Sequence, residues 1–205
     1  MTAPKRRGRP GLDLATVVER SVDVFNERGF DGTSMEHLAQ RIGITKSAIY
    51  HHVPSKDALL GLALDRALSG LERVADDARR SDAQAVDRLE LLMRQSVAVL
   101  VEQLPYVTLL LRVRGNSEVE RQALARRRRL DRLAAGLVKD AVGAGELRPG
   151  IDPVVTARLL FGMVNSLTEW LRPAGTNDAG ELADAVHDAV FEGLRVREPG
   201  AAVRR

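Results

Sequence analysis

Apolar residues recur at helical spacing along most of this chain. Near the amino end four of them stand at positions i, i+3, i+4 and i+7, namely Met35, Leu38, Ala39 and Ile42. This spacing is the buried stripe of a short helix. Thr33 with Glu36 three residues later predicts a capping box at the start of that helix, and Gly43 predicts its end.

A second short helix is predicted at residues 46–52, with Thr45 as its N-terminal cap. Ala48 and Ile49 form its buried side, and polar residues occupy its outer side. A helix that ends at Gly29 precedes this pair, and another helix begins near Lys56. Two short helices joined by a glycine turn indicate a helix-turn-helix, whose second helix enters the major groove of DNA.

The remaining apolar stripes predict helices only. A long helix should begin near Lys56, and further helices should cover residues 89–104, 119–141, 159–171 and 182–194, with a brief apolar segment at 106–113. Asp152-Pro153 marks one helix start, and Asp178 with Glu181 marks another. No segment alternates as a strand does. The expected fold is all-α, with about nine helices.

Composition narrows the possible environments. The chain has 205 residues, no cysteine and a formal net charge of +3. Disulfides and thiol nucleophiles are therefore excluded, and a reducing compartment fits. The longest apolar region, residues 96–113, is interrupted by Glu102, Gln103 and Pro105, and the basic amino terminus has no apolar stretch typical of a secretory signal. We expect a cytoplasmic protein without a membrane partner.

The first eleven residues form a basic arm. Lys5, Arg6, Arg7 and Arg9 place four positive charges there without an acid, and Arg-Gly-Arg-Pro resembles the core of an AT-hook. Such an arm inserts arginines into a narrow A·T-rich minor groove. The alternative is a disordered basic tail that contacts phosphates without sequence preference. Both interpretations stay open at this point, and both involve DNA.

Residues 12–64 resemble the DNA-binding domain of the tetracycline-repressor (TetR) family of bacterial transcriptional regulators. The matching residues are Phe25, Gly29, Phe30, Thr33, Ser34, Leu38, Ala39, Gly43, Ser47, Tyr50, His52, Ser55, Lys56, Leu59 and Leu60. Val53 departs from the family pattern, which has Phe there. The resemblance implies a helix-turn-helix domain at 12–56, a helical ligand-binding and dimerisation domain at 57–195, and a tail at 196–205.

The resemblance and the helix geometry together assign DNA contacts. Thr33 and Ser34 should bind a phosphate at a helix start. Thr45, Lys46 and Ser47 should reach base edges at the beginning of the recognition helix. The phosphate contacts that fix register are then expected from Tyr50, His51 and Lys56.

The resemblance also implies a homodimer on a palindromic operator, through the last two apolar helices. The expected interface residues are Leu160, Met163, Val164, Leu167, Val186, Val190 and Leu194. A symmetric dimer presents two recognition helices about one DNA turn apart, roughly 34–36 Å. The alternative is that both stripes face the core of their own chain.

Arginines suggest where a small-molecule effector binds. Arg126 and Arg127 interrupt an apolar stripe, which is costly for a charge without a partner or solvent. The expected ligand residues are Tyr106, Leu110, Arg112, Asn116, Arg126, Arg127, Asn165 and Trp170. A faint likeness to regulators of fatty-acid and sterol catabolism suggests an acyl-CoA or another hydrophobic anion. A solvated helix face paired with Glu118 and Glu120 explains the arginines equally well.

Catalytic chemistry finds no support in the sequence. It contains no glycine-rich phosphate loop, no nucleophile elbow and no HExxH motif. His51 and His52 are adjacent and point apart on a helix, so they do not form a metal site. We expect no enzyme, no metal and no cofactor. The expected function is a DNA-binding regulator, a ligand-released repressor; the alternative is an architectural binder of A·T-rich DNA without ligand control.

Overall fold

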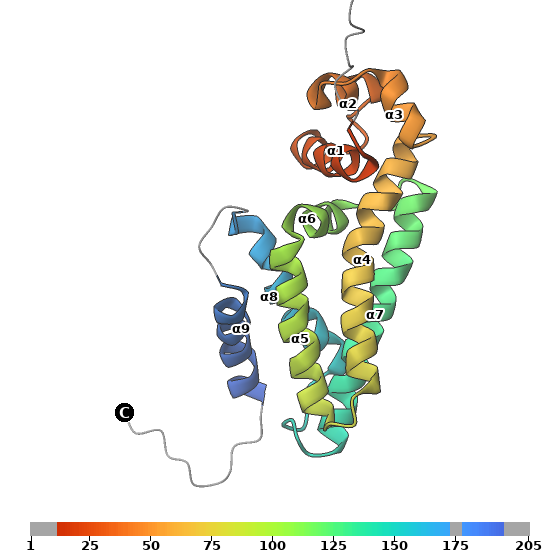
Figure 1. The fold of residues 1–205 in the computed structure, drawn as a ribbon. Coiled ribbons are helices and arrows are strands. Elements are labelled where there is room, and N and C mark those ends of the chain that lie inside the picture. Colours follow the sequence, from red (N-terminus) through yellow and green to blue (C-terminus); the bar gives the residue numbers. More distant parts are fainter. Residues whose placement is uncertain (1–11, 173–177, 195–205) are drawn as a thin grey trace, which may run out of the picture. The chain divides into compact units, whose positions relative to one another are not determined.

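The computed structural model describes residues 12–172 and 178–194. Every element in these two ranges is an α-helix, which confirms the predicted all-α class. The nine helices in this part of the chain are labelled in Figure 1: α1 Leu14–Arg28, α2 Met35–Ile42, α3 Lys46–His52, α4 Lys56–Arg80, α5 Ala85–Glu102, α6 Leu104–Arg112, α7 Glu118–Gly143, α8 Pro153–Trp170 and α9 Ala179–Leu194. None of these helices is both long and apolar enough to span a bilayer.

The chain forms two compact units that meet within α4, between Ala63 and Leu64. The sequence placed this boundary at residue 56. The difference arises because Leu59, Leu60 and Ala63, in the first two turns of α4, are fully buried and belong to the amino-terminal unit. The predicted arm at 1–11 and the predicted tail at 196–205 lie outside the described residues.

The amino-terminal unit has a small core centred on α1. Phe25 is 1% exposed and meets the ring of Phe30 edge to face, with centroids 5.2 Å apart. Gly29 ends α1 with a φ of 80°, a left-handed value that favours glycine. Arg20 Nη1 donates a hydrogen bond to the carbonyl of Ile42 (3.1 Å), which ties α1 to the end of α2. α1 therefore packs against the helix-turn-helix and stabilises it.

The start of α2 differs in one residue from the expectation. Ser34, not Thr33, is the N-terminal cap: its hydroxyl accepts from the backbone N–H of His37 (3.2 Å). His37 Nδ1 accepts in return from the backbone N–H of Ser34, so His37 replaces the expected Glu36 in the capping box. The side chain of Thr33 is buried. The capping box exists, shifted by one position.

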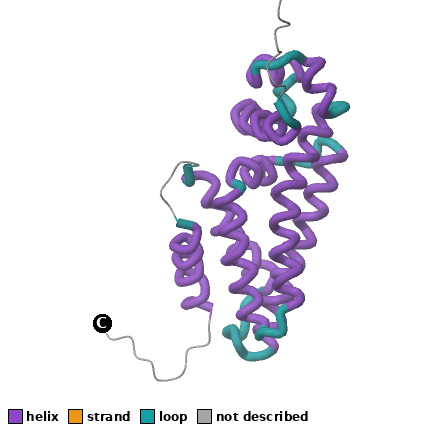
Figure 2. Tube along the Cα trace, in the orientation of Figure 1, coloured by secondary structure: helices purple, strands orange, loops and turns teal. Residues whose placement is uncertain are grey.

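The carboxyl-terminal unit is built around α5, which packs against α6, α7, α8 and α9 (Figure 2). The predicted starts of the last two helices are confirmed. The Asp152 carboxylate accepts from Val155 N–H (2.8 Å) ahead of Pro153, and Asp178 accepts from Glu181 N–H (3.1 Å). Pro105 lies in the first turn of α6, where a missing N–H costs nothing.

A buried carboxylate organises the loop before α7. Glu120 is 3% exposed, and its Oε2 accepts three backbone hydrogen bonds, from Arg114 (3.0 Å), Gly115 (2.6 Å) and Asn116 (2.9 Å). The sequence interpretation of Glu120 as an exposed partner of the arginines is therefore wrong, because its buried carboxylate binds the backbone of the loop. Bonds of this kind to a charged acceptor are stronger than those to a neutral one.

We expect Glu120→Gln to destabilise the protein by about 1–3 kcal/mol, because an uncharged amide satisfies three converging donors poorly. Urea unfolding followed by circular dichroism at 222 nm measures the change. Glu118→Gln is the matched control, since Glu118 is exposed and bonds to the side chains of Arg121 and Gln122. Equal loss in both variants would contradict the role assigned to Glu120.

Candidate nucleic-acid interface and effector cavity

The outer face of α3 carries the polar residues that the sequence assigned to base reading. Ile49 is fully buried and anchors the helix, while Tyr50 is 46% exposed. Thr45 caps the helix, with its hydroxyl accepting from Ala48 N–H (3.1 Å). The other predicted contact residues on this face are also exposed: Lys46, Ser47 and His51. The amino-terminal unit thus presents one polar helix face to solvent.

The Lys46 side chain has two contacts within the amino-terminal unit. Its ammonium forms an ion pair with Glu36 of α2 and lies 5.9 Å from the centroid of the Tyr50 ring. The hydrogen bond from Lys46 lowers the pKa of the Glu36 carboxyl, and the same bond raises the pKa of Lys46. Both side chains are largely exposed, so the pair is weak and can open in favour of a base or a phosphate.

Two of the residues predicted to contact phosphates have hydrogen-bond partners within the protein. Thr33 is 2% exposed, its hydroxyl donates to the carbonyl of Gly29 (2.7 Å), and its N–H donates to the carbonyl of Phe30 (3.1 Å). The Lys56 ammonium donates to the carbonyls of Phe30 and Thr33, both at 2.7 Å, and lies 4.2 Å from the Phe30 ring centroid. Both side chains therefore stabilise the loop between α1 and α2.

Ser34, also predicted to contact a phosphate, is half-buried, and its hydroxyl caps α2. The predicted minor-groove contacts of Arg6, Arg7 and Arg9 lie outside the described residues. Among the described residues, the candidate interface is consequently the outer face of α3 together with the start of α2.

Lys56→Met should destabilise the amino-terminal unit by about 1–3 kcal/mol, because two part-buried carbonyls lose their donor. Thermal unfolding of the full chain measures the effect. Lys139→Met, which removes an exposed charge from α7, is the control and should leave the midpoint unchanged. A Lys56→Met protein of parental stability with weakened DNA binding would instead restore the phosphate role.

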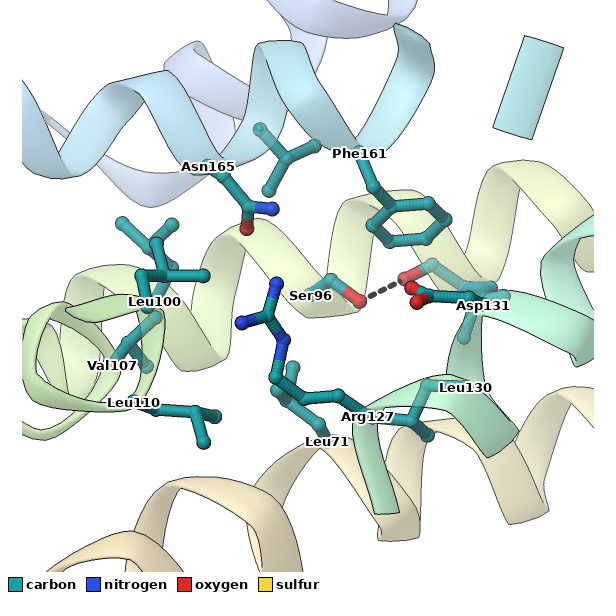
Figure 3. A pocket seen from close by; sticks show the side chains of 13 residues that line it. Leu71, Ser96, Leu100, Val107, Leu110, Arg127, Leu130, Asp131, Phe161 and Asn165 are labelled. Carbon is teal, nitrogen blue, oxygen red and sulfur yellow. Dashed lines mark hydrogen bonds between the residues drawn. The ribbon is translucent and has the colours of Figure 1, made fainter. Parts of the chain in front are cut away.

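A cavity lies inside the carboxyl-terminal unit, among residues of α4 to α8. The empty space among its lining residues is about 640 Å³, which includes solvent at its open side. Most of the lining is aliphatic: Leu71, Leu92, Leu100, Val107, Leu110, Leu111, Leu130 and Val164, with Phe161. The polar lining residues are Ser96, Arg127, Asp131 and Asn165 (Figure 3).

The arginines that interrupt the apolar stripe of α7 have different environments. Arg126 is bonded to α4: it reaches both carboxylate oxygens of Glu72 (2.8 and 2.7 Å) and Asp65 Oδ1 (2.8 Å). The hydrogen bond from Arg126 lowers the pKa of the Glu72 carboxyl, and Glu72 raises the pKa of Arg126. Arg126, predicted to bind the ligand, does not line the cavity, and its guanidinium is already paired with two acids.

Arg127, about 100° further around the helix, reaches the cavity. Figure 3 shows its guanidinium pointing into the cavity toward the Asn165 amide, with the Asp131 carboxylate on the other side near Phe161. In residues 12–172 and 178–194, no ion pair or hydrogen bond of the Arg127 side chain is found. The hydroxyl of Ser96 donates to the carbonyl of Leu92 (2.7 Å). Arg127 and Asp131 are the charged residues of the lining, and among the described residues neither forms an ion pair or a side-chain hydrogen bond.

The other residues predicted to bind the ligand fall into two groups, those that line the cavity and those that do not. Leu110 and Asn165 line the cavity with Arg127. Tyr106 does not, because its ring lies under Arg66, with 4.5 Å from guanidinium carbon to ring centroid, and its hydroxyl accepts from that side chain (3.1 Å). Three more predicted residues lie outside the lining: Arg112, Asn116 and Trp170. Reasoning from the sequence missed Phe161 and Asp131, although their spacing from Asn165 and Arg127 places them on the same helix faces.

The residues of the predicted dimer interface differ in exposure. Four of its residues are at most 5% exposed and belong to the core of their own unit: Leu160, Val164, Leu167 and Val186. Val190 and Leu194 are half-buried. Met163 is 40% exposed, and it shares one face of α8 with Leu159 (69%) and Trp170 (52%). The buried stripe of α8 and its exposed apolar face are thus different sets of residues.

Comparison with known proteins identifies the family. The chain matches "Bacterial regulatory proteins, tetR family" over residues 17–63 and "Tetracyclin repressor-like, C-terminal domain" over residues 82–194. It is 48% identical to SCO3833 of Streptomyces coelicolor A3, a member of the TetR transcriptional regulator family, with 96% of each chain covered and a TM-score of 0.81.

Two further relatives are similar to it. AibR, whose crystal structure contains isovaleryl coenzyme A and operator DNA, is 25% identical, with 86% of this chain and 97% of AibR covered and a TM-score of 0.74. The transcriptional repressor DrrR1 of Streptomyces coeruleorubidus is 34% identical over 96 residues, 47% of this chain and about a third (34%) of DrrR1. DrrR1 is a transcriptional repressor, and AibR is in complex with operator DNA. The chain therefore belongs to the tetR family of bacterial regulatory proteins and is a DNA-binding transcriptional regulator.

Proposed function

We propose that this regulator binds a palindromic operator as a homodimer and represses transcription until an effector enters its cavity. The effector carries an apolar chain and an anionic group, as an acyl-CoA does. The observation on which the effector class depends is Arg127, a cation that points into an aliphatic cavity (Figure 3).

A charge in such a cavity is costly unless an opposite charge or water compensates it. Arg126 shows how this protein neutralises an arginine for structural purposes, with two carboxylates from α4. The described residues supply no such ion pair to Arg127. A ligand anion would provide one, while the leucines around it would accept an acyl chain. AibR supports this class, since its structure contains an acyl-CoA together with operator DNA.

The homodimer is supported by α8 and by the size of α3. Leu159, Met163 and Trp170 expose large apolar side chains along one face of α8, which is typical of an interaction surface. A seven-residue recognition helix reads only a few base pairs. Pairing two copies would double the number of base contacts and impose two-fold symmetry on the operator.

Release by the effector requires that the ligand bind two conformations with different affinity. α4 connects the two functions, because it contains Leu60, buried with the helix-turn-helix unit, and Leu71, which lines the cavity. A ligand that shifts the carboxyl-terminal part of α4 would alter the spacing of the two recognition helices in a dimer.

The operator is found first, by footprinting DNA around the protein's own gene. Decanoyl-CoA is then titrated into the preformed operator complex while fluorescence anisotropy follows the labelled DNA. We expect release by the parent, and at least about tenfold more ligand for Arg127→Ala, which loses one charge-assisted contact. Arg129→Ala, an exposed neighbour, should respond as the parent does. An operator complex that survives saturating bound ligand would refute effector control.

A further inference from the structure

A groove next to the cavity is lined by basic residues. It lies between α7 and α8 and has a volume of about 580 Å³, much of it open to solvent. Arg128 and Arg132, four residues apart, lie on one face of α7, and Arg158 lines the groove from α8. The rest of the lining is short or apolar apart from one acid: Asp131, Ala135, Val154 and Ala157.

The groove continues the cavity along the same pair of helices. From these two helices the cavity is lined by Arg127, Leu130, Asp131, Phe161, Val164 and Asn165, and the groove by Arg128, Asp131, Arg132, Ala135, Val154, Ala157 and Arg158. Numbers rise along α7 while they fall along α8, as in antiparallel neighbours. Asp131 lines both spaces. The groove and the cavity are therefore neighbours that share one lining residue.

The three arginines of the groove are not neutralised by an acid in the part of the chain that the structure describes. Arg128, Arg132 and Arg158 are exposed, and none of the ion pairs found there includes them. Asp131 is the one carboxylate among the lining residues. Like charges four residues apart on a helix destabilise it. Arginine suits phosphate because its planar donors bind two oxygens at once.

The groove is also separate from the exposed apolar face of α8. Arg158, Phe161 and Asn165 recur at spacings of three and four residues and face α7. Leu159 and Met163 lie about 100–140° around the helix from Arg158. A ligand in the groove and a second copy of the chain on the Leu159 face would not compete for the same side of α8.

We propose that the groove binds the phosphate-bearing head of a ligand whose acyl tail enters the cavity. This inference rests on the proposed effector function and specifies its ligand. An acyl chain joined to one or more phosphates is the chemical class. Coenzyme A thioesters and monoacylglycerol phosphates both belong to it, and a plain fatty acid does not.

The test is direct binding by isothermal titration calorimetry with three probes that share one tail: decanoyl-CoA, decanoyl-glycerol phosphate and decanoate. The parent should bind at least one phosphorylated probe about ten- to a hundredfold more tightly than decanoate. The triple variant Arg128→Ala, Arg132→Ala, Arg158→Ala should lose that advantage and still bind decanoate normally. A charge-matched control, Arg73→Ala, Arg80→Ala, Lys139→Ala, should retain it. Circular dichroism verifies the fold of both variants.

Three outcomes would overturn the inference: no binding of any probe by the parent, no advantage of the phosphorylated probes, or an advantage that persists in the triple variant. Which phosphorylated probe binds more tightly identifies the source of the phosphate. Operator release is measured separately. A probe that shows the arginine-dependent advantage but leaves the operator complex intact would keep the groove and refute effector control, so the two failures are distinguishable.

Discussion

Lys46→Ala combined with Tyr50→Ala should lower operator affinity by about ten- to a hundredfold, with little loss of folding stability. Both side chains lie on the exposed face of α3, and neither contributes to the core that Ile49 anchors. A lysine that donates to guanine supplies affinity and base preference, and a tyrosine at this position fixes register on a phosphate. The loss should therefore include a change in sequence preference.

The ion pair between Lys46 and Glu36 gives this prediction a matched counterpart. Lys46→Ala leaves the Glu36 carboxylate facing the DNA phosphates without its partner, which adds repulsion to the lost contact. Glu36→Gln removes the competing acid, so it should strengthen operator binding severalfold and steepen its salt dependence. Fluorescence anisotropy at two salt concentrations measures both effects. Unchanged affinity in the double alanine variant would exclude α3 as the recognition helix.

Local signals explain why the helix-turn-helix could be predicted from the sequence. The stripe from Met35 to Ile42, the turn at Gly43 and the cap at Thr45 all lie within a dozen residues. They indicate a buried helix face, a helix end and a helix start, respectively. The error at the cap of α2 has an equally local cause. Thr33 and Ser34 are adjacent and both can cap, and only the burial of Thr33 against the α1–α2 loop decides between them.

The residues that line the cavity were harder to predict, because they depend on the direction in which each arginine side chain points from α7. Arg126 and Arg127 differ by about 100° on the helix, so one meets the acids of α4 and the other enters the cavity. The partners of Arg126 are 54 and 61 residues away in sequence, and periodicity carries no information on contacts of that range. The groove arginines were missed for the same reason, since Arg158 belongs to a different helix.

The second apolar face of α8 leads to the other large expected effect. Leu159→Glu should convert the proposed homodimer to a monomer, because two copies of a glutamate would meet across a symmetric apolar interface. Operator affinity should then fall by about 10²–10⁴, the gain that joining two binding modules provides. Sedimentation velocity measures the oligomeric state, and anisotropy measures the operator affinity of the same samples.

The neighbouring residue provides the control, because the two leucines have opposite exposure. Leu159 is 69% exposed, whereas Leu160 is 1% exposed and lies in the core of its own chain. Leu160→Ala should cost about 2–5 kcal/mol of unfolding free energy and leave the folded protein dimeric. If Leu159→Glu remains a dimer while Leu160→Ala dissociates, the interface involves the stripe inferred from the sequence and not the exposed face. A monomeric parent would remove the basis for a palindromic operator altogether, because symmetry in the DNA has physical meaning only when the protein reads it twice.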